Sequence, residues 1–170
     1  MLISSSVPSD FGKGITIPIP KDDKSIRVHK IDNFRGIKLS PIISKVFEHC
    51  LLIMFQKHLC TSDNQFAFKA HTGCSNAIYV LRNVIDFYIE NETTVNLGCL
   101  DISKAFDKLN YYVLFMKLMK RKMPSNIIEL LLKWYSLSYS CVRWGTVLSE
   151  PFRLLAGVRQ GGVLLCFLYI

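Results

Sequence analysis

Apolar and polar residues follow two patterns along this chain. Alternation of every second residue predicts strands, and recurrence about every four residues predicts helices. Residues 15–19 alternate apolar residues with Thr and Pro, which indicates an edge strand because proline cannot donate to a ladder. A charged hairpin loop over 21–30 and an extended segment over 33–39 follow. Apolar pairs then recur every four residues over 42–55, which predicts a helix of about five turns that starts at Ser40.

The same patterns divide the rest of the chain. An apolar run over 95–100 predicts a buried strand that ends on Asp101. The other expected elements are a turn at 60–64, an alternating segment at 65–69, helices over 75–90, 111–122 and 125–139, a hairpin over 141–148 and 152–155 that turns at 149–151, a glycine-rich turn over 157–162, and the first turns of a buried helix over 163–170.

Composition limits the class of protein. A 50% hydrophobic chain of 170 residues is enough for one domain with a real core. The net charge of +8 indicates either a polyanionic partner or simply a basic surface. The chain up to Lys45 holds eight basic and four acidic side chains, so this opening region is a basic face. The cations from Lys117 to Lys122 fit a helix carboxyl end and a nucleic-acid patch equally well.

The cysteines and the apolar runs bear on the compartment. None of the six cysteines forms a C-x-x-C pair, and no histidine stands at zinc-site spacing. Cys99 falls in the predicted buried strand and Cys50 on the apolar face of the first helix, so we interpret the cysteines as reduced core residues of an intracellular protein. No apolar run approaches the ~18–20 residues of a membrane span, and the start lacks a signal-peptide layout.

Asp101 carries the first sign of chemistry. A buried strand that delivers an aspartate at its carboxyl end can present a metal ligand to a crevice, although Asp is also a common helix cap. The stretch Leu100-Asp101-Ile102-Ser103-Lys104-Ala105-Phe106-Asp107 resembles the first catalytic-aspartate motif of reverse transcriptases, specifically those of non-LTR (LINE-like) retrotransposons.

Four further segments resemble the same family in the same order. They are Ile17-Pro18-Ile19-Pro20-Lys21, then 33–41 (NFRGIKLSP) with 44–48 (SKVFE) behind it, then 65–69 (QFAFK), and 157–164 (GVRQGGVL). One such match would be weak, but five collinear matches across residues 15 to 164 are specific.

The resemblance implies a fold and a reaction. The expected fold class is α+β: a partial right-hand polymerase fold, fingers and part of the palm without a thumb, with helices packed on a small antiparallel sheet. Residues 1–14 would be a loose lead-in and 15–170 an incomplete reverse transcriptase domain. The reaction would be template-directed nucleotidyl transfer with two Mg²⁺ ions, Asp101 being the first metal ligand and the catalytic residue. An RNA template, a DNA primer and dNTPs would be the partners, in the nucleus or cytoplasm.

The resemblance also implies nucleotide-binding residues. Phe106 matches the aromatic gate beneath the sugar, although a core aromatic is the commoner role of phenylalanine. Arg35 matches the fingers arginine, whose planar fork suits phosphate oxygens, and its alternative is a solvated surface position. Gln160 would lie near the incoming nucleotide, and Gly161 would let the backbone approach it closely. Asp107 is expected to be structural.

The departures from the family pattern lower the expected activity. The sequence stops at Ile170, before the family's Tyr-x-Asp-Asp hairpin, and one carboxylate cannot hold two Mg²⁺ ions. A Ser-Pro pair is missing after Leu164, and Ala67 replaces a usual glycine. We therefore expect an incomplete domain without polymerase activity.

Two other classes of function stay open. One is a non-catalytic nucleic-acid-binding module built from the basic fingers face around Lys21, Arg35 and Lys45. The other is an inert remnant whose exposed palm edge and apolar surface promote self-association.

Overall fold

The computed structural model describes residue 2 and residues 6–21, 30–59, 61–103, 105, 107–157, 162 and 164. Its helices are α1 (Ile42–Met54), α2 (Cys74–Glu90), α3 (Tyr111–Lys120) and α4 (Ser125–Ser136). Its strands are β1 (Lys13–Pro20), β2 (Phe34–Leu39), β3 (Tyr139–Trp144), β4 (Val147–Leu148) and β5 (Phe152–Arg153). Short 3-10 turns lie at Ser9–Gly12, Ile31–Asn33 and Gln56–His58. The α+β class is confirmed.

The sheet is mixed, whereas the sequence predicted an antiparallel one. Its strand order is β2-β1-β3-β4, and β5 also pairs with β3. β1 is antiparallel to β2 but parallel to β3, with Lys13 opposite Tyr139 and Thr16 opposite Val142. More than a hundred residues separate β1 from β3 in sequence, so their relative direction follows from how the intervening helices pack and not from any local pattern.

β1 lies inside the sheet, so its prediction as an edge strand was wrong. Its prolines are tolerated because of where β3 stops. The Lys21 N–H donates to the Asn33 carbonyl of the β2 side at 2.9 Å. Backbone N–H groups alternate in direction along a strand, so those of odd-numbered residues in β1 point toward β2 and those of even-numbered residues point toward β3. β3 pairs with β1 only as far as Thr16, so Pro18 and Pro20 lack an N–H where no described strand needs one.

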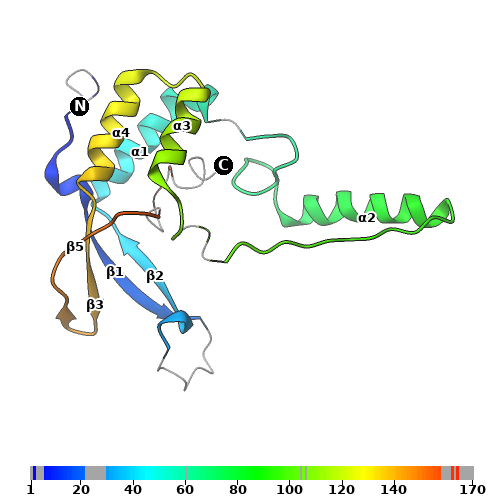
Figure 1. Ribbon diagram of the computed structural model, residues 1–170, viewed down its shortest axis with the longest axis horizontal. Coiled ribbons are helices and arrows are strands. Elements are labelled where there is room, and N and C mark those ends of the chain that lie inside the picture. The colour runs from blue at the N-terminus through cyan, green and yellow to red at the C-terminus, as the bar shows by residue number, and fades with distance from the viewer. Residues whose placement is uncertain are drawn as a thin grey trace.

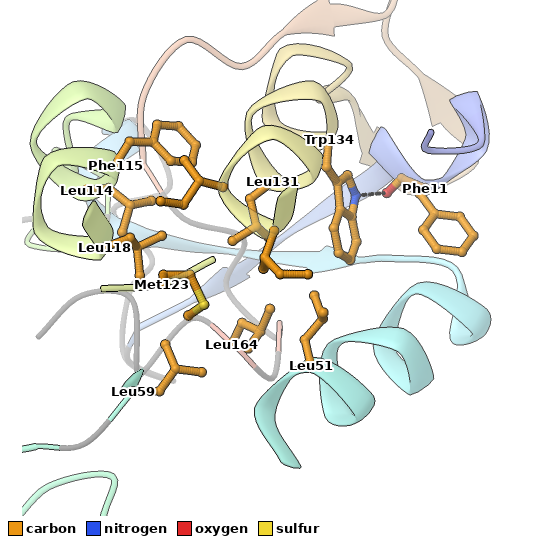
Figure 2. Close-up of a cluster of buried hydrophobic side chains, with 12 residues drawn as sticks. Phe11, Leu51, Leu59, Leu114, Phe115, Leu118, Met123, Leu131, Trp134 and Leu164 are labelled. Atoms are coloured by element: carbon orange, nitrogen blue, oxygen red, sulfur yellow. Dashed lines mark hydrogen bonds between the residues drawn. The ribbon is translucent and has the colours of Figure 1, made fainter. Parts of the chain in front are cut away.

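Residues 9–14, expected in a loose lead-in, are ordered by the core. Phe11 is only 6% exposed, and its carbonyl accepts a hydrogen bond from the Trp134 indole N–H at 3.0 Å (Figure 2). The Phe11 and Trp134 rings lie 5.6 Å apart, and Phe47 of α1 lies 5.7 Å from Trp134. These three aromatic side chains join the N-terminal segment, α1 and α4.

The core lies where α1, α3 and α4 gather at one end of the sheet (Figure 1). Its buried members are Phe11, Leu51, Leu59, Leu114, Phe115, Leu118, Met123, Ile127, Ile128, Leu131, Trp134 and Leu164 (Figure 2). α3 and α4 were both predicted, and each ends two or three residues before its expected boundary.

α1 buries only one edge of its predicted apolar stripe, Phe47, Leu51 and Phe55, together with two polar residues. Ser44, Glu48 and Leu51 are buried on α1. Their polar groups are satisfied, because the Ser44 hydroxyl donates to the Pro41 carbonyl and Glu48 accepts from the Leu164 N–H. The exposed members of the stripe are Ile42, Ile43, Val46, Cys50 and Met54. Tertiary packing therefore determines which side of α1 is buried. The core position expected for Cys50 was wrong, because Cys50 is exposed.

The predicted hairpin exists, but its turn lies elsewhere. Trp144 pairs with Val147 across a tight turn at Gly145, whose φ of +60° favours glycine. The expected turn at 149–151 instead connects β4 to β5, which returns to place Phe152 opposite Ser140.

Among the described helices, none combines the length and apolarity that crossing a bilayer requires.

α2 and residues 91–103 project from the rest of the molecule, and we call this segment the arm (Figure 1). α2 was predicted, yet none of its described residues is buried. Residues 95–100 form no strand, so the predicted buried strand was wrong, and so was a buried Cys99. Leu100 is 99% exposed. An apolar run becomes a strand only beside a partner, and no described strand pairs with this segment.

The close approach of the 3-10 turn at Ser9–Gly12 to the end of α4 can be tested at Gly12. A Cβ on Gly12 would overlap the carbonyl group of Leu137, which is backbone and cannot rotate away. We expect Gly12→Ala to lower the free energy of unfolding by about 1–3 kcal/mol, measured by urea denaturation. Gly98→Ala is the control, because a Cβ there meets nothing within 4 Å. Equal stability of the two variants would contradict this packing.

Candidate functional site

Asp101 follows the extended part of the arm and lies outside any strand. Its side chain is exposed. Within the described ranges, no group of three His, Cys, Asp or Glu side chains is close enough to share a metal ion. Asp101 is an oxygen ligand of the kind Mg²⁺ prefers, but a two-ion site needs more carboxylates around it. The described residues therefore do not fit a two-metal centre.

Three of the expected nucleotide-binding residues cannot be placed. Phe106, Gln160 and Gly161 lie outside the described residues, so their roles stay predictions from the family resemblance. Asp107 is described and exposed.

Arg35 and Lys21 come together at one end of the sheet. Arg35 lies on β2 directly opposite Ile19, and its side chain is exposed. Lys21 follows β1, and its N–H bond to Asn33 extends the β1–β2 ladder by one step. Since side chains two residues apart on a strand share a face, Lys21 lies on the face that carries Ile19 and Arg35. The hairpin thus brings two of the predicted contact residues to one surface.

The sheet adds two arginines that the sequence analysis missed. Arg143 lies two residues after Cys141, which pairs with Ile15, so it shares the face of Ile15 and Ile19. Arg153 pairs directly with Tyr139 on the same face. Both side chains are exposed. Only the parallel pairing of β1 with β3 brings Arg143 and Arg153 to the face that carries Arg35, with Arg153 at the Lys13 end of the sheet and Arg35 at the Ile19 end, so no local sequence signal could have found them.

We call this surface the open sheet face. Its members are Lys13, Ile15, Ile17, Ile19, Lys21, Arg35, Ile37, Leu39, Tyr139, Cys141, Arg143 and Arg153. On the opposite face Lys38 and Ser140 are buried, whereas Trp144 and Phe152 are exposed. No member of the open sheet face is buried, and Ile19, Leu39 and Tyr139 are exposed. The residues named here include five cations and no carboxylate.

A hollow of about 600 Å³ lies at one end of the open sheet face. Ile15, Leu39, Tyr139 and Cys141 are among the residues that line it. Lys13 stands at the same place, with its ammonium 2.8 Å from the Asp10 carboxylate. The hollow therefore has an apolar floor, and the lysine at its border is paired with Asp10.

Lys45, the last predicted contact residue, lies on α1 and not on the sheet. Its side chain is half-buried. The structure thus groups Lys21 and Arg35 on one face and places Lys45 on a different element.

A search of curated proteins identifies one relative across almost the whole chain. It is the "Probable RNA-directed DNA polymerase from transposon X-element" of Drosophila melanogaster, 30% identical over 167 residues. The alignment covers 95% of this chain and 18% of the relative, so the chain spans less than a fifth of that protein. No protein-family model matches the sequence. The chain is homologous to a transposon RNA-directed DNA polymerase, and the resemblance to reverse transcriptases is confirmed.

A magnesium titration tests the isolated position of Asp101. A single exposed carboxylate gives Mg²⁺ one protein ligand, and the ion then keeps most of its waters. We expect the NMR signals around Asp101 to respond only at millimolar Mg²⁺, and Asp101→Asn to leave thermal stability in Mg²⁺ unchanged. The control variant is Asp10→Asn. The isolated position of Asp101 would be contradicted if the NMR response saturated at micromolar Mg²⁺ and if Asp101→Asn, but not Asp10→Asn, abolished that response.

Proposed function

We propose that the chain is the fingers and part of the palm of a reverse transcriptase from a LINE-like retrotransposon, and that its open sheet face contacts nucleic acid. Homology to a transposon RNA-directed DNA polymerase over 95% of the chain supports the family assignment. The cationic open sheet face supports nucleic-acid contact, and it is the single observation that carries this function. The nucleus or cytoplasm is the proposed location.

The chemistry of the open sheet face suits a nucleic-acid backbone. Arginine forks on Arg35, Arg143 and Arg153 match the geometry of phosphate oxygens, and Lys21 adds a point charge. Each neutralised phosphate releases condensed counterions, which favours binding at low salt. The isoleucine floor and Tyr139 offer apolar surface to sugars and bases. In the proposed assignment, the ligand is an RNA template paired with a DNA primer, and dNTPs are the substrates.

Catalysis is a separate question from binding. Mg²⁺ is the cofactor expected of the family, and Asp101 is its proposed ligand. Because the described residues gather no group of three metal-ligating side chains at Asp101, we propose that this chain by itself binds without polymerising.

The binding proposal makes a prediction about charge. The double variant Arg35→Gln, Arg143→Gln should weaken binding of an RNA–DNA duplex, and the slope of log K against log salt should flatten by about one for each lost phosphate contact. Fluorescence anisotropy from low to high salt measures both. The control is the double variant Arg82→Gln, Lys133→Gln, which removes the same charge from α2 and α4. Equal loss in both variants would show that only net charge matters.

The activity proposal is tested by primer extension with Mg²⁺ and dNTPs. We expect no product above background, because one carboxylate cannot position two metal ions. Asp101→Ala should behave as the unmodified chain does. Robust synthesis that Asp101→Ala abolishes would overturn the proposed lack of activity.

A second candidate property is self-association. The arm favours it, because α2 has no buried residue and residues 95–100 lack a strand partner. This property does not require nucleic acid.

A further inference from the structure

The arm exposes backbone as well as side chains. Among the described residues, those from 94 to 100 make no hydrogen bond to any other part of the protein. Their backbone is not helical, and the chain runs extended in the view of Figure 1. An extended segment with unpaired N–H and C=O groups on both edges is a template for pairing with another strand.

The arm also exposes enough apolar surface for an interface. Its large exposed apolar side chains are Ile78, Tyr79, Val80, Leu81, Val84, Phe87, Tyr88, Ile89, Leu97, Leu100 and Ile102. At their observed exposures they present on the order of 1,000 Å², and a standard interface takes about 800 Å² from each partner. A hollow lined by Tyr79, Val84 and Phe87 already marks one side of α2.

Charge does not oppose self-pairing along this segment. Between Glu92 and Asp101 the sequence holds no charged residue. Proteins that keep exposed strands apart place lysines or other charges on them, and residues 93–100 have none. A second copy is therefore a partner whose apolar segment and bare backbone edges match those of the arm.

We propose that two copies of this chain associate through their arms, with residues 93–101 paired as antiparallel strands about a two-fold axis at Leu97. This register places Leu97 opposite Leu97 of the second copy and Val95 opposite Cys99. Asp101 then lies opposite Thr93. Moving the axis to Gly98 or Cys99 would place Asp101 opposite Val95 or Leu97, and moving it to Asn96 would place Glu92 opposite Leu100, so each shift sets a carboxylate against an apolar neighbour.

Sedimentation of the full chain tests the association. The unmodified chain should form a dimer, and Leu97→Lys should raise the dimer dissociation constant at least about tenfold, because two ammonium groups then face each other at the axis. The control is Ile31→Lys, since Ile31 is exposed but lies outside the arm. A monomer at every concentration, large aggregates, or a dimer that both variants preserve would overturn the proposal.

Cross-linking tests the register. Val95→Cys introduces a thiol opposite Cys99 of the second copy, at a separation suited to a disulfide. Under mild oxidation this variant should form covalent dimers about tenfold faster than Asn96→Cys, whose thiol points to the other face of the ribbon. Equal rates in the two variants would overturn the register.

The inference deepens the proposed self-association and does not depend on nucleic-acid binding. Leu97→Lys leaves the open sheet face unchanged. If the chain binds the RNA–DNA duplex but stays monomeric, only the arm pairing is overturned. If the chain forms the dimer but does not bind the duplex, only the proposed function is overturned.

Discussion

The contact between Trp134 and Phe11 fixes the rest of the structure. The Trp134 indole N–H reaches the Phe11 carbonyl at 3.0 Å, and both rings pack with Phe47 of α1. β1 begins two residues after Phe11, and β3 begins five residues after Trp134. Holding these two aromatics together therefore sets Lys13 opposite Tyr139, which is the first pair of the parallel ladder. An unsatisfied indole N–H in this core would cost about 1–3 kcal/mol.

The open sheet face depends on that ladder. Arg35 and Lys21 come from a local hairpin, but Arg143 and Arg153 join them only because β3 lies beside β1. The core thus assembles a cationic surface from two pairs of strands, β1 with β2 and β3 with β5, that are far apart in sequence. The arm has no comparable tie to the core, since α2 has no buried residue. Asp101, which lies in the arm, is accordingly exposed, and the described residues gather no group of three metal-ligating side chains around it.

The sequence predicted what local periodicity determines. The four helices, the β1–β2 hairpin and the second hairpin at 139–153 were all found, because a period of four or two is a property of neighbouring residues. The buried face of α1 was predicted only in part, since Phe47, Leu51 and Phe55 of its apolar stripe pack on the core but Ser44 and Glu48 lie inward with them and the rest of the stripe is exposed. The strand before Asp101 was wrong because an apolar run shows propensity and not a partner. The parallel pairing, and with it Arg143 and Arg153, depends on long-range packing that no local pattern contains.

The most direct test of this account is hydroxyl-radical footprinting of the chain with and without an RNA–DNA duplex, read residue by residue by mass spectrometry. The account predicts that the duplex protects Tyr139, Ile19 and Leu39, which lie exposed on the open sheet face. Exposed residues of the arm, such as Tyr79 and Phe87, should keep their reactivity. Protection of the arm without protection of the open sheet face would contradict the account.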